Sequence, residues 1–540
     1  MRTLRPVLTL AFCVLATATG RAQPLPPADR PIETVVDEQI DSAIASASVA
    51  PAPQADDATY IRRVTLDLVG RIPTVVEVDR YVTSTDSAKR TALVDRLLAS
   101  PAYARHQAEQ FAAMFIDGER RPTTLRDYFA AALKENRPWD RIFRELMLPD
   151  DADPKLKGAS DFLRTRLTDT DRLTNDVSVA FFGVNVSCAQ CHDHPLVKDW
   201  TQDHFYGMKS FLARTYDGGT GPAERGFGVV RFKPNKGAEK AARMMFLTGA
   251  AIEEPTTREM TKEEQKKEKE AAEEAKKTKK APPKPAFSAR AKLVEVALKQ
   301  GNSDFFARSI VNRMWHRYFG MGLVNPLDQM HSENPPSHPE LLAWLARDTA
   351  THSYDLKRLT RGLVLSRAYS RSSRYPSEAT PDAKLFAVAR LKPFTPMQLA
   401  TSLRVAAADP AMFETLSADE FEKRIEQFEG SARGFAPQIA QPTENFQVGV
   451  GEALLFSNGD RVFREFLTDG TGSLLARAKA AKAPGEAVGL LVKAVYGRSP
   501  TPDETRALVE YVAKRADRSA EAYRQVLWAL VTGPEFRFVY

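Results

Sequence analysis

Cys188, Cys191 and His192 form one short motif in a chain of 540 residues. The chain has only one other cysteine, Cys13. Cys13 lies inside an apolar stretch near the N-terminus, so the rest of the chain holds a single close pair of thiols. One close pair cannot provide the disulfide framework on which many secreted proteins depend. The fold therefore cannot rest on disulfide bonds, and the two thiols serve a local purpose.

The spacing of this motif, C-x-x-C-H, is the attachment signature of c-type haem. Two thiols three positions apart can each bond one vinyl-derived carbon of the porphyrin edge, and the next residue can ligate the iron. Cys188 and Cys191 are therefore the predicted cofactor-binding residues, and His192 is the predicted metal ligand. Apolar and aromatic residues at 177–186 and 200–208 offer the surroundings that a haem edge or a buried metal needs.

Two other interpretations of the cluster stay open. Zinc could be bound by Cys188, Cys191, His192 or His194, with His204 as a further candidate ligand. Alternatively, the two cysteines form a disulfide that closes a turn, because exported C-x-x-C pairs do oxidise. The distal ligand of a haem cannot be named from the sequence, and the candidates are His204, Met208, His316, Met330, His331 and Met397.

The N-terminus has the features of an export signal. Arg2 and Arg5 form a short basic region, residues 7–18 are apolar, and 20–22 place small residues at the −3 and −1 positions. We therefore expect a signal peptide over residues 1–22 and export to the periplasm, the cell envelope or the medium, with a possible envelope association. No later stretch offers eighteen apolar residues without charge, so no transmembrane span is expected in the mature chain.

Apolar residues with helical spacing fill most of the chain. In the clearest case, Asp56 and Asp57 precede an apolar run that Gly70 closes, which are start and stop signals of a helix. We expect a mainly α, multi-helical two-domain protein with a small irregular or β segment between the domains. The predicted order is a signal peptide (1–22), a helical domain with the C-x-x-C-H motif (30–215), an irregular segment with short strands (216–256), a charged linker (257–287) and a helical C-terminal domain (288–540).

The charge pattern gives no sign of a nucleic-acid partner. The formal net charge of +7 is modest for this length, and one lysine-rich segment with mixed charge signs accounts for part of it. Glycine-rich phosphate loops, G-x-S-x-G and H-E-x-x-H are missing from the sequence, so no catalytic residue is predicted. A non-enzymatic role is favoured, although enzymatic activity stays open. Arg62, Arg63 and Asp67 are expected to form a buried or half-buried charge cluster that joins helices.

Several phrases in order resemble a pair of planctomycete domains. Residues 56–74, 97–103 and 188–200 resemble the planctomycete cytochrome-associated domain of unknown function. A second set of segments resembles the usual partner of that domain, a second planctomycete domain of unknown function. These segments are residues 306–315, 322–324, 334–337, 353–357, 366–369, 497–502 and 533–536. The resemblance covers most of residues 30–210 and 288–540. It implies an exported, mainly helical protein of a kind often fused to or encoded near haem-binding cytochrome modules.

The resemblance also carries the family's cysteine phrase onto Cys188, Cys191, His192, Asp193, His194 and Pro195. We therefore expect an exported c-type haem protein with one haem at Cys188, Cys191 and His192. Its expected role is electron transfer or redox sensing with a redox partner protein that the sequence does not identify. The alternative hypothesis is a non-catalytic structural or binding protein of the cell envelope, whose cluster binds zinc or forms a local disulfide.

Overall fold

The computed structural model describes residues 25–540 apart from 117–122, 194–196, 256, 300, 302 and 443–447, and of Ser303 it describes only the backbone. Over these residues the chain forms 24 α-helices and three antiparallel sheets of two short strands each. The predicted mainly α fold is therefore confirmed. The predicted signal peptide and His194 lie outside the described residues.

The first helices precede the irregular segment. They are α1 (Ile32–Ser46), α2 (Asp57–Val69), α3 (Val75–Val82), α4 (Lys89–Ala99), α5 (Pro101–Phe115), α6 (Thr123–Lys134), α7 (Trp139–Met147), α8 (Asp161–Arg164), α9 (Thr170–Phe182) and α10 (Gln202–Leu212). The remaining helices are α11 (Lys262–Thr278), α12 (Ala289–Leu298), α13 (Ser303–Phe319), α14 (Pro339–Thr351), α15 (Leu356–Leu365), α16 (Pro396–Ala407), α17 (Ala418–Arg433), α18 (Val450–Asn458), α19 (Asp460–Phe466), α20 (Leu474–Lys479), α21 (Pro484–Tyr496), α22 (Pro502–Ala513), α23 (Ser519–Thr532) and α24 (Pro534–Arg537).

Helix α2 begins and ends where its sequence signals predict. The carboxylate of Asp56 accepts a hydrogen bond from the backbone N–H of Thr59 at 2.7 Å, which caps the first turn. Gly70 ends the helix in the left-handed region with φ of 73°. A Cβ at Gly70 would lie 2.3 Å from Nδ1 of His106, so both the backbone angle and the close packing require glycine.

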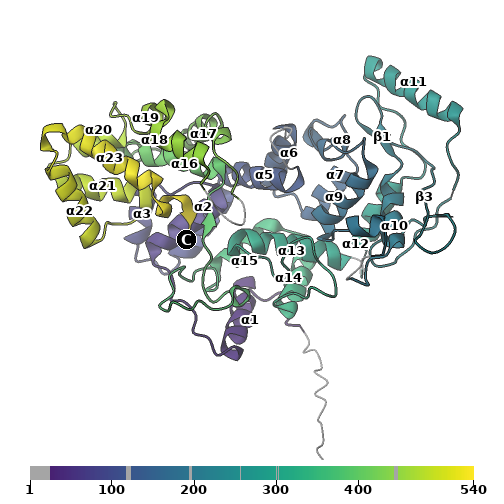
Figure 1. Cartoon of the computed structure of the whole chain (residues 1–540), viewed down its shortest axis with the longest axis horizontal. Helices are drawn as coiled ribbons and strands as arrows, with labels where there is room; N and C mark the ends of the chain where they lie inside the picture. The colour runs from purple at the N-terminus through teal and green to yellow at the C-terminus, as the bar shows by residue number, and fades with distance from the viewer. Residues whose placement is uncertain are drawn as a thin grey trace, which may run out of the picture.

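Two hydrophobic cores hold the helices together. The larger core packs α1–α10 and α12–α15, so helices from both sides of the predicted boundary at residue 288 share it. The smaller core packs α16 and α18–α24 against Leu66 of α2 and Ile72 just after it. In Figure 1 the purple α2 accordingly lies beside the green and yellow C-terminal helices.

The predicted charge cluster is buried where the two cores meet. Lys392 Nζ donates to both carboxylate oxygens of Asp67, at 2.6 and 2.7 Å, and the hydroxyl of Tyr369 donates to the same carboxylate at 2.7 Å. Arg62 donates to the backbone oxygen of Val495 at 3.0 Å, and Arg63 to that of Tyr540 at 3.0 Å. The cluster therefore ties α2 to segments more than 300 residues later in the chain.

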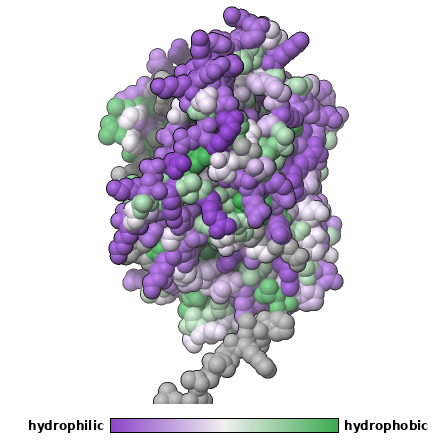
Figure 2. All heavy atoms as spheres, turned by 90° about the vertical axis from the view of Figure 1, so that its right-hand side faces the viewer, coloured by the Kyte–Doolittle hydropathy of each residue, from purple (hydrophilic) through white to green (hydrophobic). Residues whose placement is uncertain are grey.

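The segment between α10 and α12 contains the predicted short strands, and the charged linker forms one solvated helix, α11. Strand β1 (Thr215–Asp217) pairs with β2 (Pro222–Glu224), and β3 (Arg231–Phe232) pairs with β4 (Lys240–Ala241). The third pair joins β5 (Lys392–Pro393) to β6 (Phe538–Val539). Helix α11 projects from the molecule (Figure 1), and the top of the face on which it lies is mainly hydrophilic (Figure 2). No helix in the described part of the chain is long and apolar enough to cross a membrane.

Candidate functional site

The C-x-x-C-H motif lies on the connection between α9 and α10. Gly183 ends α9 in the left-handed region with φ of 69°, and Val184 then forms a β-bridge with Gln329. A single 3-10 turn, η2 (Ser187–Gln190), carries the first cysteine, and Cys191 follows directly. The apolar residues 177–186 thus form the end of a helix and a short extended piece directly before the motif.

Side chains before the motif hold the start of η2 in place. Asn185 Oδ1 accepts hydrogen bonds from the N–H and the hydroxyl of Ser187, at 3.1 and 2.6 Å. Asn175 of α9 accepts from the N–H of Val186 at 3.0 Å. Because both acceptors are side chains fixed close to α9, the turn that carries Cys188 has a defined position relative to that helix.

Helix α10 packs back on the motif from the other side. Gln202 donates from Nε2 to the backbone oxygen of Cys191 at 3.2 Å. The hydroxyl of Tyr206, one turn later, donates to the backbone oxygen of Gln190 at 3.0 Å. Asp193 in turn accepts from the N–H of Gln202 at 2.9 Å. These bonds fix the backbone on which both thiols are mounted.

Both thiols are free and both cysteines are exposed to solvent. His192 is also exposed, and its Nδ1 lies 2.7 Å from the backbone oxygen of Asp193. A carbonyl oxygen can only accept, so Nδ1 carries the ring proton in this contact. The lone pair of the neutral ring is then on Nε2, which is the arrangement found in metal-ligating histidines.

His204, the further candidate for a zinc or haem ligand, has the opposite tautomer. Its Nδ1 accepts from the backbone N–H of Thr201 at 3.3 Å and lies 2.9 Å from the Thr201 hydroxyl, which caps α10. The proton of the neutral ring is therefore on Nε2. Burial lowers the pKa of His204. The ring packs edge-on against Trp200, with 5.7 Å between centroids, so this histidine has a structural role in the fold.

The other candidates for a distal ligand are spread over the structure. Met208 is fully buried in the larger core, and Met397 packs against the smaller core. Burial and neighbouring cations lower the pKa of His316 to about 4. Met330 and His331 both line a cavity next to Asp199. Within the described part of the chain, no three His, Cys, Asp or Glu side chains are grouped so that they could hold a metal ion.

Residues from the second half of the chain contact the segments directly before and after the motif. The sequence did not predict these contacts. The N–H of Asn185 donates to the backbone oxygen of Asp328 at 2.8 Å, and the N–H of Met330 donates to that of Gly183 at 3.0 Å. After the motif, Asp199 accepts from the N–H and hydroxyl of Ser332, at 2.7 and 2.9 Å. In the sequence, residues 322–324 and 334–337 were noted only for their resemblance to the second domain. That resemblance does not show that they lie beside the motif.

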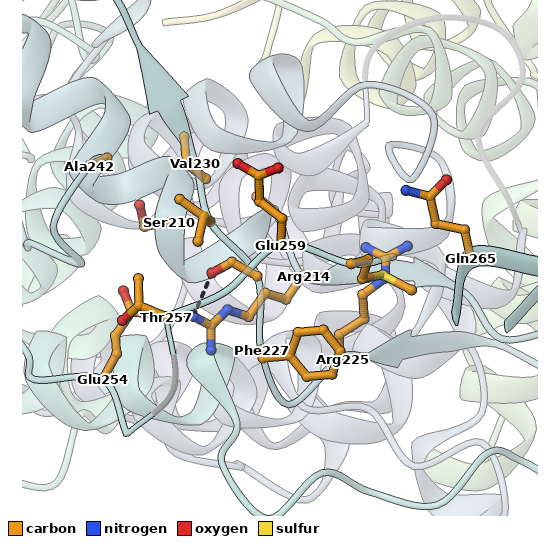
Figure 3. Close-up of a pocket in the computed structure, with 14 residues that line it drawn as sticks. Ser210, Arg214, Arg225, Phe227, Val230, Ala242, Glu254, Thr257, Glu259 and Gln265 are labelled. Atoms are coloured by element: carbon orange, nitrogen blue, oxygen red, sulfur yellow. Dashed lines mark hydrogen bonds and ion pairs between the residues drawn. The ribbon is translucent and has the colours of Figure 1, made fainter. Parts of the chain in front are cut away.

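A polar cavity of about 320 Å³ lies between α10 and the irregular segment (Figure 3). Arg214 forms an ion pair with Glu254 there and donates to the backbone oxygen of Gly228 at 3.0 Å. Arg225 pairs with both carboxylate oxygens of Glu268, each at 2.6 Å. Carboxylates of the same chain thus already satisfy both arginines. Neither cysteine of the motif lines this cavity.

Comparison with known protein families identifies two domains in order. Residues 35–217 match the model of PSCyt2, described as a protein of unknown function (DUF1549), and residues 289–415 match that of PSD1, also described as a protein of unknown function (DUF1553). No curated protein and no solved structure matches the chain. The first match contains the whole motif and α10, and the second contains the segment that brackets the motif. The predicted pairing of the two domains is therefore confirmed.

Proposed function

The chain belongs to the proteins that combine a PSCyt2 domain with a PSD1 domain, and from this premise we propose that it is an exported protein with one covalent haem c. The observation that carries the proposal is the state of the motif. Two free, exposed thiols lie three positions apart on an anchored turn, and the next residue is a histidine whose lone pair is on Nε2. These donors fit the chemistry of haem attachment.

Each residue of the motif has a separate task in this proposal. Cys188 and Cys191 would hold the porphyrin edge through thioether bonds, and His192 would ligate the iron through Nε2. The backbone oxygen of Asp193 would keep the proton on Nδ1, which orients the ring and increases its basicity. Gln202 and Tyr206 would keep the turn in place.

A haem, when bound, supplies reversible one-electron chemistry. The exposure of both cysteines and of His192 supports exchange with another protein at this surface rather than with a substrate in a closed pocket. We therefore propose electron transfer or redox sensing with a partner protein outside the cytoplasm. The N-terminal sequence supports export, because its basic, apolar and small-residue regions are typical of a signal peptide.

The test is a pyridine haemochrome spectrum of the full-length chain exported through a periplasm that attaches haem. We expect a c-type α-band that survives denaturation in the wild type and disappears in the double variant Cys188→Ala/Cys191→Ala, because both thioether bonds are then lost. Lys198→Ala is the matched control, since it changes an exposed residue close to the motif and leaves both thiols and the hydrogen bonds that anchor η2.

The contrary outcome is wild-type protein that is exported and folded but has no α-band. Zinc content and titration of free thiols on the same sample then separate the two remaining interpretations. One zinc ion per chain, lost in the double variant, indicates a zinc site. Two missing thiols that return on reduction indicate a disulfide between Cys188 and Cys191.

A further inference from the structure

A second cavity, of about 440 Å³, lies beside the segment that follows the motif. Asp199 forms one side of it, the first turns of α13 form another, and the segment from Val324 to Pro336 closes it. Both matched domains therefore contribute to its walls. Its volume is within the range of about 300–1,000 Å³ that is typical of small-molecule sites.

Arg308 of α13 lines this cavity and has no hydrogen-bond partner among the described residues. Its Nε is buried, and burial lowers the pKa of the guanidinium. Other arginines with a partnerless buried nitrogen each donate a hydrogen bond from a second nitrogen, namely Arg62, Arg63, Arg71, Arg290, Arg313 and Arg404. Arg308 as a whole is half-buried. Because buried donors are normally satisfied, its buried Nε–H indicates a ligand that accepts a hydrogen bond there.

The remaining walls restrict the chemistry of that ligand. Phe305, whose ring centroid is 6.0 Å from that of Trp200, forms an apolar wall together with Val324. Two carboxylates, Asp199 and Asp304, also line the cavity. Asp199 is already satisfied by Ser332, whereas Asp304, one turn before Arg308 on α13, acts on Arg308 through its charge alone and offsets part of the pKa lowering caused by burial. Both carboxylates repel any anion, but they repel a dianion such as phosphate about twice as strongly as a monoanion, so a single guanidinium favours the monoanion.

We propose that this cavity binds a small organic carboxylate. The carboxylate pairs with the guanidinium of Arg308, whose planar fork matches two carboxylate oxygens. The apolar part of the ligand packs on Phe305, Val324 and Pro335, which all line the cavity. The site is independent of the proposed haem, because it needs neither thiol of the motif.

Isothermal titration of the full-length protein with three probes tests the site: acetate, cyclohexanecarboxylate and benzoate. We expect saturable 1:1 binding of at least one ring-bearing carboxylate. Arg308→Gln should weaken that binding by about tenfold or more, because it removes a charge-assisted hydrogen bond. Arg308→Lys should fall between the two. Arg374→Gln is the control, since Arg374 is exposed and donates no side-chain hydrogen bond to a described residue.

A second comparison needs no variant and therefore holds even if Arg308→Gln fails to fold. Benzamide has the shape of benzoate without its charge, and we expect it to bind the wild type about tenfold more weakly or worse. Inorganic phosphate should not compete with the carboxylate. The proposal is overturned if none of the three carboxylates binds saturably, if benzamide binds as well as benzoate, or if Arg308→Gln folds and binds like the wild type.

Discussion

At the scale of single residues, the structure separates side chains that share a type but differ in role. His192 and His204 are both histidines close to the cysteines, and sequence alone made both candidate ligands. Their Nδ1 atoms have opposite partners, a carbonyl oxygen at His192 and a backbone N–H at His204. The tautomer, and with it the availability of Nε2, follows from this difference.

Two glycines give a prediction at the same scale. Gly70→Ala should destabilise the protein by about 1–3 kcal/mol, because alanine is strained at φ of 73° and its Cβ would collide with His106. Gly489→Ala in α21 should instead stabilise by about 0.5–1 kcal/mol, because a Cβ there meets no atom within 4 Å and alanine is the better helix former. Urea unfolding of both variants measures the difference. Equal signs would contradict this explanation.

At the scale of elements, the sequence predicted most of what depends on neighbours in the chain. Caps such as Asp56 act within three or four residues, so α2 could be placed correctly. The pairing of Asn185 with Asp328, 143 positions apart, leaves no local pattern and was missed. The cavity around Arg308 was missed for the same reason, because its walls come from separate parts of the chain. The C-x-x-C-H motif itself could be recognised in the sequence, because its chemistry depends on spacing alone.

The anchoring of η2 gives a prediction for this element. Asn185→Ala should speed hydrogen exchange at the N–H of Ser187 by roughly fivefold to tenfold, because a lost hydrogen bond is worth about 1 kcal/mol. Alkylation of Cys188 should become faster as well. Ser332→Ala is the control, since its backbone N–H still donates to Asp199 and it does not touch η2. Unchanged exchange in Asn185→Ala would show that Asn175, Gln202 and Tyr206 hold the turn without Asn185.

At the scale of the whole molecule, the end of the chain completes the smaller core. Phe536 and Val539 are buried there, and the backbone oxygens of Phe536 and Tyr540 accept from Arg62 and Arg63. Such contacts span more than 470 positions, which is long even for a chain of this length. The two cores are therefore coupled through α2 rather than joined by a flexible hinge.

Removal of residues 536–540 tests this coupling. We expect a loss of several kcal/mol in the free energy of unfolding, because the burial of Phe536 alone is worth about 3–5 kcal/mol and two buried arginines lose acceptors. Tyr540→Phe keeps the backbone acceptor and should stay within about 1 kcal/mol of the wild type. Denaturant unfolding followed by circular dichroism measures both. A truncated chain as stable as the wild type would contradict the coupling.

Contacts with residues far along the chain can form only after those residues have been synthesised. Arg63 of α2 can contact Tyr540 only after 477 further residues have been made. Until then Arg62 and Arg63, which are buried in the folded protein, remain exposed to water. Asn185, close to the motif, can likewise contact Asp328 only after 143 further residues have been made. In the proposed haem protein, the thiols of the motif would therefore be accessible to a haem-attaching enzyme before the surrounding structure has closed.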